Sequence, residues 1–188
     1  MMNDGDLIEH TLSSELVFDG ELLKVHRDKI RHHDETEAVR EWIAHPGAVV
    51  VIALLDNGHL IFERQFRYPL HQIFLEFPAG KIEANEHPLD TARRELREET
   101  GYIAKSWRHL ATMHPCIGYS DEHIEIFWAQ GLSYVGHERD AGEHLEIHEM
   151  TIADALLAVR EGEITDAKTI TALLWADKIL SGTWPLPD

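Results

Sequence analysis

The sequence predicts a protein of the α+β or mixed α/β class, built around a mostly mixed β-sheet. Three observations predict this class: short alternating or apolar runs typical of strands occupy most of the chain, one helical pattern lies among them, and two more follow them. The chain has 188 residues, of which 44% are hydrophobic, so it can bury a core of ordinary size.

Residues 1–45 predict a small arm of β structure. Rough alternation over residues 15–31, interrupted by an Asp-Gly turn, predicts a short hairpin or a pair of strands. A polar tract over residues 32–37 predicts a loop, and residues 38–43 predict another strand. This arm has too few apolar residues for a core of its own. We therefore expect it to pack on the main domain, residues 46–188, or on another subunit.

The main domain shows clearer patterns. Residues 56–59, with the sequence Asp-Asn-Gly-His, supply a tight turn between two strands. Pro88 suits the first turn of a helix, apolar residues recur behind it at helical spacing, and Gly101 ends it. The expected strands are residues 48–55, 60–66, 72–77, 107–113, 123–130 and 144–150, and the expected helices are residues 88–100, 152–161 and 166–180.

The composition excludes several classes of partner. Acidic residues outnumber basic ones by 34 to 17, for a net charge of −17, so the chain repels nucleic acid and anionic membranes. An anionic substrate would need a bound cation. The longest aliphatic run, residues 48–55, is too short to span a bilayer. The acidic, polar start and the single cysteine, Cys116, lead us to expect no signal peptide, no disulfide and a cytosolic location.

Acidic side chains gather on one side of the helix expected at residues 88–100. At about 100° per residue, Glu95, Glu98 and Glu99 share one side, and an apolar stripe lies directly beside them. Crowded carboxylates repel one another unless a cation neutralises them. Oxygen ligands without Cys or a His pair favour Mg²⁺ or Mn²⁺ over Zn²⁺. The alternative is a solvated acidic helix face, and the fixed spacing of the surrounding residues favours the metal site.

The spacing around these glutamates matches a known motif. The pattern is G-x5-E-x7-R-E-U-x-E-E-x-G-U, where U is bulky and apolar, and it is met by Gly80, Glu86, Arg94, Glu95, Leu96, Glu98, Glu99, Gly101 and Tyr102. This is the Nudix box, and the chain resembles a Nudix hydrolase from about residue 22 to the last helix. The resemblance implies an α/β/α sandwich with a mixed sheet that hydrolyses a nucleoside diphosphate linked to another moiety.

The resemblance also implies roles within the box. Glu95, Glu98 and Glu99 would bind the metal ions together with the carbonyl oxygen of Ala79. Arg94 would hold the carboxylates in place rather than touch the substrate. The remaining positions of the box would be structural, with backbone turns at the two glycines: Gly80, Glu86 and Gly101.

Stretches outside the box resemble the ADP-ribose pyrophosphatase subfamily. They are residues 45–51, 64–69, 75–80 and 118–122. By this resemblance Arg67 would contact the diphosphate, Glu76 would assist the metal or substrate site, and Arg40 with Glu41 would reach a substrate from the arm. Arg64 and Arg67 beside an acidic helix fit an anion clamp better than an exposed strand face.

Catalysis also needs a base to activate water. In this subfamily a glutamate on a loop before the last strand often has that role, and Glu143 is the best positional match, with Glu146 in reserve. An ordinary acidic surface loop is the alternative. Ile117 stands where the subfamily usually has a proline, and Phe18 and Trp42 match the family's stacking aromatics only roughly. These departures leave the base and sugar of the substrate open but not the hydrolysis of its diphosphate.

Together the residues and the resemblance predict Mg²⁺-dependent hydrolysis of ADP-ribose to AMP and ribose 5-phosphate, with Mn²⁺ as the other candidate ion. Glu98, Glu99 and Glu143 would be catalytic. The expected assembly is a homodimer that exchanges the arm. One alternative is the same chemistry on another nucleotide sugar, such as GDP-mannose, or on a dinucleotide. The other is a non-catalytic sensor, which would not need the complete set of glutamates.

Overall fold

The computed structural model describes residues 4–138 and 144–187, so Glu143 lies outside the described residues. The chain divides into two compact units. The first comprises Met1–Pro46 and Cys116–Glu122, and the second comprises Gly47–Pro115 and His123–Asp188. Within the described ranges, no helix is long and apolar enough to cross a membrane.

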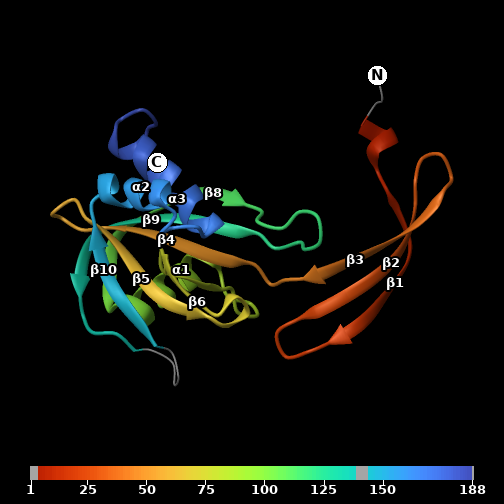
Figure 1. Ribbon diagram of the computed structural model, residues 1–188, viewed down its shortest axis with the longest axis horizontal. Coiled ribbons are helices and arrows are strands. Elements are labelled where there is room, and N and C mark those ends of the chain that lie inside the picture. Colours follow the sequence, from red (N-terminus) through yellow and green to blue (C-terminus); the bar gives the residue numbers. More distant parts are fainter. Residues whose placement is uncertain (1–3, 139–143, 188) are drawn as a thin grey trace. The chain divides into compact units, whose positions relative to one another are not determined.

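The first unit is a three-stranded antiparallel sheet in the order β1-β2-β3 (Figure 1). Its elements are a short 3-10 helix, η1 (Asp4–Leu7), and the strands β1 (His10–Asp19), β2 (Lys24–Arg31) and β3 (Glu37–Ala44). The segment Cys116–Glu122 joins it through hydrogen bonds from the N–H of Ile43 to the carbonyl of Tyr119, 2.8 Å, and from the Ser120 hydroxyl to the Ile43 carbonyl, 3.1 Å. Ile30 is the one buried hydrophobic residue among those described here, and every residue of β1 is exposed.

The second unit contains a mixed sheet in the order β10-β5-β4-β9-β8. The pair β4 and β9 is parallel, and the other neighbours are antiparallel. The strands of this path are β4 (Ala48–Leu54), β5 (Leu60–Arg67), β8 (Tyr102–Met113), β9 (Ile124–Tyr134) and β10 (Leu145–Met150). The predicted strands are all present; β8 begins directly after the first helix, earlier than the expected residue 107.

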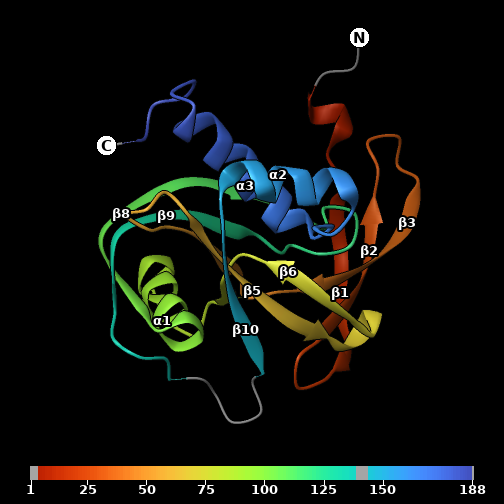
Figure 2. The same cartoon turned by 60° about the vertical axis from the view of Figure 1, so that its left-hand side comes forward.

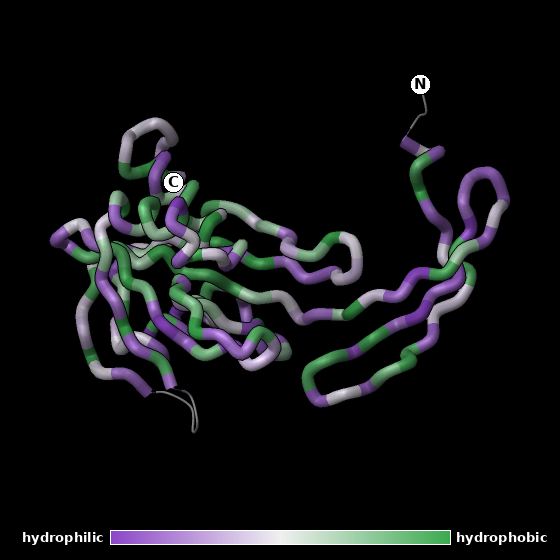
Figure 3. Tube along the Cα trace, in the orientation of Figure 1, coloured by the Kyte–Doolittle hydropathy of each residue, from purple (hydrophilic) through white to green (hydrophobic). Residues whose placement is uncertain are grey.

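Helices cover both faces of this sheet, as Figure 2 shows. One face carries α1 (Pro88–Thr100) and the other carries α2 (Ile152–Glu161) and α3 (Ala167–Leu180). Because successive side chains of a strand point to opposite faces, Val50 and Ile52 of β4 pack in the core with α2 and α3, while Val49 and Val51 pack with α1. Because both faces of β4 are covered, its residues are hydrophobic along the whole strand (Figure 3). The predicted α/β/α layering is confirmed.

The strands β4 and β5 separate beyond their connecting turn, and two short strands occupy the space between them. The two strands pair at Leu54 and Leu60. Further along, β6 (Gln72–Glu76) pairs with β5, and β7 (Ala79–Lys81) pairs with β4. The link between β6 and β7 is fixed by the N–H of Val51, which donates to the carbonyl of Pro78 at 2.9 Å. The sheet therefore holds Glu76 and Ala79 at its interior, below the end of α1.

The ends of α1 follow from its sequence. Pro88 occupies the first turn, where a missing N–H costs nothing, and His87 caps it. Gly101 adopts a left-handed conformation with φ 78°, and its N–H donates to the carbonyl of Arg97 at 2.8 Å. Glycine is favoured here because a Cβ is strained at this φ. The predicted stop is confirmed, and it fixes where the acidic last turn of the helix lies.

Packing of α1 can be tested at Leu96, which is fully buried among β4 and β9 residues. Leu96→Ala should lower the free energy of unfolding by about 3 kcal/mol, because it leaves a cavity under the helix. Leu174→Ala on α3, where the side chain is 48% exposed, should cost less than about 1 kcal/mol. Urea denaturation followed by circular dichroism measures both. Equal costs would contradict this account of the core.

Candidate active site

The three glutamates of α1 lie at the border between core and solvent. Glu99 is buried, the side chain of Glu95 is mostly buried, and that of Glu98 is about one-third exposed. The apolar side of α1 packs against the sheet through Ala92 and Leu96, which turns this acidic side toward β7. The helical spacing therefore places the carboxylates where the sequence predicts them, at the edge of the domain core.

Arg94 binds three carboxylates of the box. Its Nε and Nη2 atoms donate to the two carboxylate oxygens of Glu86, each at 3.0 Å. Its Nη1 atom donates to Glu95 at 2.8 Å and to Glu98 at 3.1 Å. A single guanidinium thus faces three carboxylates and fixes Glu86 by both oxygens, the strongest geometry for such a pair.

The hydrogen bonds from Arg94 lower the pKa of Glu86 to about 2. Thr91 adds a hydrogen bond from its hydroxyl at 2.8 Å. Since the pKa is lowered on folding, the ionised form of Glu86 stabilises the fold above its ordinary pKa of 4.5, and this contribution is lost as the pH falls toward 2. The anchor formed by Glu86 and Arg94 is therefore intact at neutral pH.

Strand β7 meets α1 at very short range. The N–H of Ala79 donates to a carboxylate oxygen of Glu99 at 3.2 Å. A Cβ at residue 80 would lie 1.9 Å from a carboxylate oxygen of Glu95, so only glycine lets Glu95 occupy this position. The structure thus brings together the predicted ligand residues Ala79, Glu95 and Glu99.

Arg67 and Glu76 form a second ionic group on β5 and β6. Arg67 binds both oxygens of Glu76, at 2.7 and 2.9 Å, and Glu76 is almost completely buried. Lys168, in the first turn of α3, also contacts Glu76 and donates to Asp166 at 2.9 Å. Lys168 is not among the site residues predicted from the sequence. The available signal was a cation in the first turn of a helix, where the helix dipole disfavours positive charge.

Glu63 is a further buried acid that is not among the predicted site residues. It lies on β5 directly opposite Glu76 of β6, and its exposed fraction is 0%. Neither of its carboxylate oxygens meets a hydrogen-bond donor among the described residues. Burial, and then the charge of Glu76, raise the pKa of Glu63 to about 8. A charged residue directly after the apolar run of residues 60–62 was the signal in the sequence.

The structure does not bring Arg64 beside Arg67 as one clamp. The odd spacing between them places the two side chains on opposite faces of β5. Arg64 pairs instead with Glu146 on the neighbouring strand β10, at 2.9 Å, and both side chains are exposed. The alternation that placed Glu146 on a strand is confirmed, since β10 begins at Leu145.

The residues predicted to reach the substrate from the arm are paired within the first unit. The Nε atom of Arg40 donates a hydrogen bond to a carboxylate oxygen of Glu9 at 2.9 Å. Glu41 accepts two hydrogen bonds from Arg27, at 2.9 and 2.8 Å. Arg27 and Glu41 are direct cross-strand neighbours on β2 and β3. These pairs are exposed, so they exchange with other partners at little cost.

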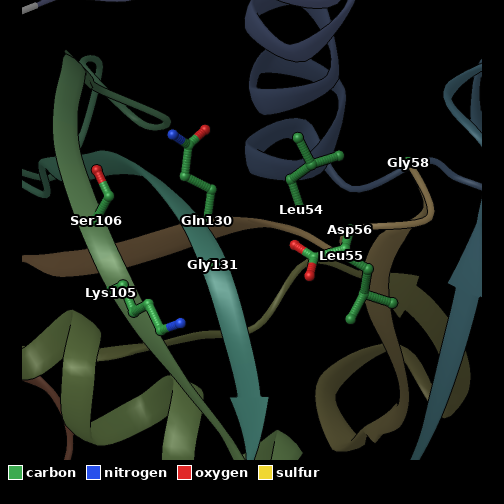
Figure 4. A pocket seen from close by; sticks show the side chains of 8 residues that line it. All are labelled: Leu54, Leu55, Asp56, Gly58, Lys105, Ser106, Gln130 and Gly131. Carbon is green, nitrogen blue, oxygen red and sulfur yellow. The ribbon is translucent and has the colours of Figure 1, made fainter.

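Two hollows in the second unit differ in their relation to this site. One, with a volume of about 340 Å³, lies beside α1 and is lined in part by Arg94, Arg97, Glu98 and Glu138. The other, of about 390 Å³, is shown in Figure 4 with Lys105 of β8, Gln130 of β9 and Asp56 of the β4–β5 turn at its wall. It contains none of the predicted site residues. The first hollow is therefore the one that adjoins the acidic helix.

The donors at this site fit a hard divalent cation. They are carboxylates and a backbone carbonyl, the ligands that Mg²⁺ and Mn²⁺ prefer. Gly80 leaves room for Glu95 close to β7, and the buried oxygens of Glu63 lack a donor. No group of three or more His, Cys, Asp or Glu side chains is already arranged as a metal cage within residues 4–138 and 144–187. Glu95 and Glu98 would therefore have to turn from Arg94 toward a cation.

Comparisons with known proteins agree with this geometry. The family described as NUDIX domain matches residues 44–173. An ADP-ribose pyrophosphatase of Bacillus subtilis (strain 168) is 39% identical over 169 residues, 89% of this chain and 91% of that protein. A methanol dehydrogenase activator of Bacillus methanolicus is 36% identical over 167 residues, 88% and 90% of the two chains. A crystal structure of an ADP compounds hydrolase has a TM-score of 0.85 at 24% identity, over 93% of this chain and 95% of that one, which shows a shared fold.

The close approach of β7 and α1 can be tested by Gly80→Ala. The added Cβ should displace the Glu95 carboxylate and weaken Mn²⁺ binding at least about tenfold, a typical cost of disturbing the support of a metal ligand. The melting temperature should change little, because the displaced group is the movable end of a long side chain. Isothermal titration with Mn²⁺ and a thermal melt measure the two effects. Unchanged Mn²⁺ affinity would show that Glu95 does not need this position.

Proposed function

Because the chain belongs to the Nudix family, we propose that it hydrolyses the diphosphate of ADP-ribose to AMP and ribose 5-phosphate. It is a hydrolase that acts on phosphoanhydride bonds. The observation that carries the proposal is the complete glutamate set of α1, held against Ala79 and Gly80 of β7. The relative named ADP-ribose pyrophosphatase supports the choice of substrate, since its similarity extends over nearly the whole of both chains.

The metal is Mg²⁺, with Mn²⁺ as the second candidate, and it is held by Glu95, Glu98, Glu99 and the carbonyl oxygen of Ala79. When bound, such an ion neutralises phosphate charge and acidifies an attacking water. Arg94 remains hydrogen-bonded to Glu86 and so stays beside Glu95 and Glu98 when these turn toward the ion. The net charge of −17 makes a cation necessary for a dianionic substrate to approach.

Arg67 is the residue we assign to the diphosphate. Its side chain is 39% exposed, while Glu76 is buried and binds the guanidinium through both oxygens. Glu76 therefore orients Arg67 and leaves its remaining N–H groups for an anion. Arg64, on the other face of β5 and paired with Glu146, is not part of this contact, and Arg40 and Glu41 of the arm stay predicted substrate contacts. Glu143 is the proposed base, with exposed Glu146 in reserve.

We propose that residues 1–45 form the dimerisation arm and residues 46–188 the catalytic domain. The arm exposes apolar side chains that a second copy of this chain could cover, including Leu12, Leu16, Phe18, Leu22 and Val39. We also propose a cytoplasmic location, which agrees with a single cysteine and a reducing compartment.

Loss of the metal-binding carboxylates tests the activity. Glu98→Gln and Glu99→Gln should each lower the rate of ADP-ribose hydrolysis in Mg²⁺ by at least about 100-fold, because an amide cannot replace an anionic ligand. Glu161→Gln, an exposed change of equal charge at the end of α2, should leave the rate unchanged. Chromatography of AMP and ribose 5-phosphate measures the rates.

A substrate panel with the wild-type chain completes that test. Faster turnover of GDP-mannose or a dinucleotide than of ADP-ribose would overturn the choice of substrate. Binding of ADP-ribose without any hydrolysis would favour a sensor. Rates near wild type in both glutamate variants would contradict the metal assignment.

The oligomeric state tests the arm. The full chain, of 21.5 kDa, should sediment as a dimer, and Leu16→Glu combined with Val39→Glu should shift it to the monomer, because charges would then have to be buried in the interface. Sedimentation velocity at several concentrations measures this. A wild-type monomer, or a dimer unaffected by both substitutions, would contradict the proposed role of the arm.

A further inference from the structure

Glu63 is a buried acid that the proposed function does not use. It is fully buried on β5, it lies outside the Nudix box, and its two carboxylate oxygens have no donor among the described residues. Ionic groups in protein interiors are costly unless they are paired, so a position that only filled the core would be better served by an apolar side chain. The side chain must therefore carry a proton or lie beside a partner of positive charge.

The neighbours of Glu63 do not supply that partner. The charged groups that interact with it are Glu76, Glu99, Arg67 and Lys168. The two cations are already engaged with Glu76, which Arg67 binds through both oxygens and Lys168 contacts at one. The contact between Glu63 and Glu99 can be a hydrogen bond only if one of the two carboxyls carries a proton. The space between β5 and the last turn of α1 is thus lined by acids.

Glu99 links this buried acid to the metal site. One of its oxygens accepts a hydrogen bond from the N–H of Ala79. The carbonyl oxygen of Ala79 and the carboxylate of Glu95, which lies against Gly80, belong to the proposed cation site. The carboxyl of Glu99 therefore lies between β7 and Glu63. Two neighbouring carboxylates supply hard oxygen ligands of the kind that a divalent cation prefers, and water can complete its coordination.

We propose that Glu63 is a metal ligand of this chain, and that with Glu99 it holds a divalent cation on the inner side of the glutamate helix. This inference rests on the proposed function for the presence of the metal, and it adds a ligand from β5 that the box does not contain. The cation would balance the charge of Glu63, because Arg67 and Lys168 are engaged with Glu76. Glu63 would then favour the metal-bound protein and disfavour the metal-free one.

Metal binding without substrate tests this proposal. Glu63→Gln keeps the size of the side chain, and its amide can donate to the neighbouring carboxylates, so the metal-free protein should melt about 2–4 °C higher than wild type. Its affinity for at least one Mn²⁺ should fall tenfold or more, and the rise in melting temperature on adding Mn²⁺ should shrink accordingly. Electron paramagnetic resonance of free Mn²⁺ gives the number of ions and their Kd.

Two further variants complete the experiment. Glu63→Leu, which has no polar atoms, should show the same loss of Mn²⁺ affinity, and circular dichroism checks that both variants are folded. Glu161→Gln removes one exposed charge and should bind Mn²⁺ as wild type does.

Wild-type number of ions and Kd in both Glu63 variants would overturn the proposal, as would a wild-type chain that binds no Mn²⁺. The measurement needs no substrate. A chain that binds Mn²⁺ through Glu63 but does not hydrolyse ADP-ribose would refute the proposed function and leave this inference standing. If activity depends on Glu98 and Glu99 but Mn²⁺ binding is unchanged in the Glu63 variants, the proposed function stands and this inference is refuted.

Discussion

Repulsion between carboxylates around α1 is the constraint on which the second unit depends. Glu86, Glu95, Glu98 and Glu99 gather there, and Arg94 is the cation that holds three of them. A cluster of this kind costs free energy, since like charges repel one another unless a cation lies between them. The remaining structure supports the cluster: the apolar side of α1 fixes the helix on the sheet, and Gly101 fixes where its last turn ends.

The divergence of β4 and β5 explains why buried acids meet this helix. If β4 and β5 stayed paired along their length, no further strand would lie between them. Because β6 and β7 enter the space instead, their link carries Glu76 and Ala79 into the interior, and Glu76 lies directly opposite Glu63. Glu76 and the proposed ligand Ala79 therefore owe their places to one local departure from regular pairing. The same departure brings Arg67 to the surface above Glu76.

Most of the fold and the centre of the site could be predicted from the sequence. Periodicity identified the strands and helices because each buries one side, and fixed spacing identified the glutamates because they share a helix face. The paired roles of Arg67 and Lys168 could not be predicted in this way, since they depend on contacts between segments far apart in the chain. The burial of Glu63 could not be predicted from periodicity for the same reason, because it depends on residues of β6 and α1 as well as on its own strand.

Arg94 does not bind its three carboxylate partners equally, and this limits which side chain can replace it. Two of its nitrogens are committed to Glu86, and the third is divided between Glu95 and Glu98. The planar guanidinium can release the divided partners and still keep its orientation, because the fork on Glu86 fixes its plane. A lysine ammonium has no plane to fix and would follow whichever carboxylate moved. Side chains of equal charge are therefore not interchangeable here, since the position requires rigidity as well as charge.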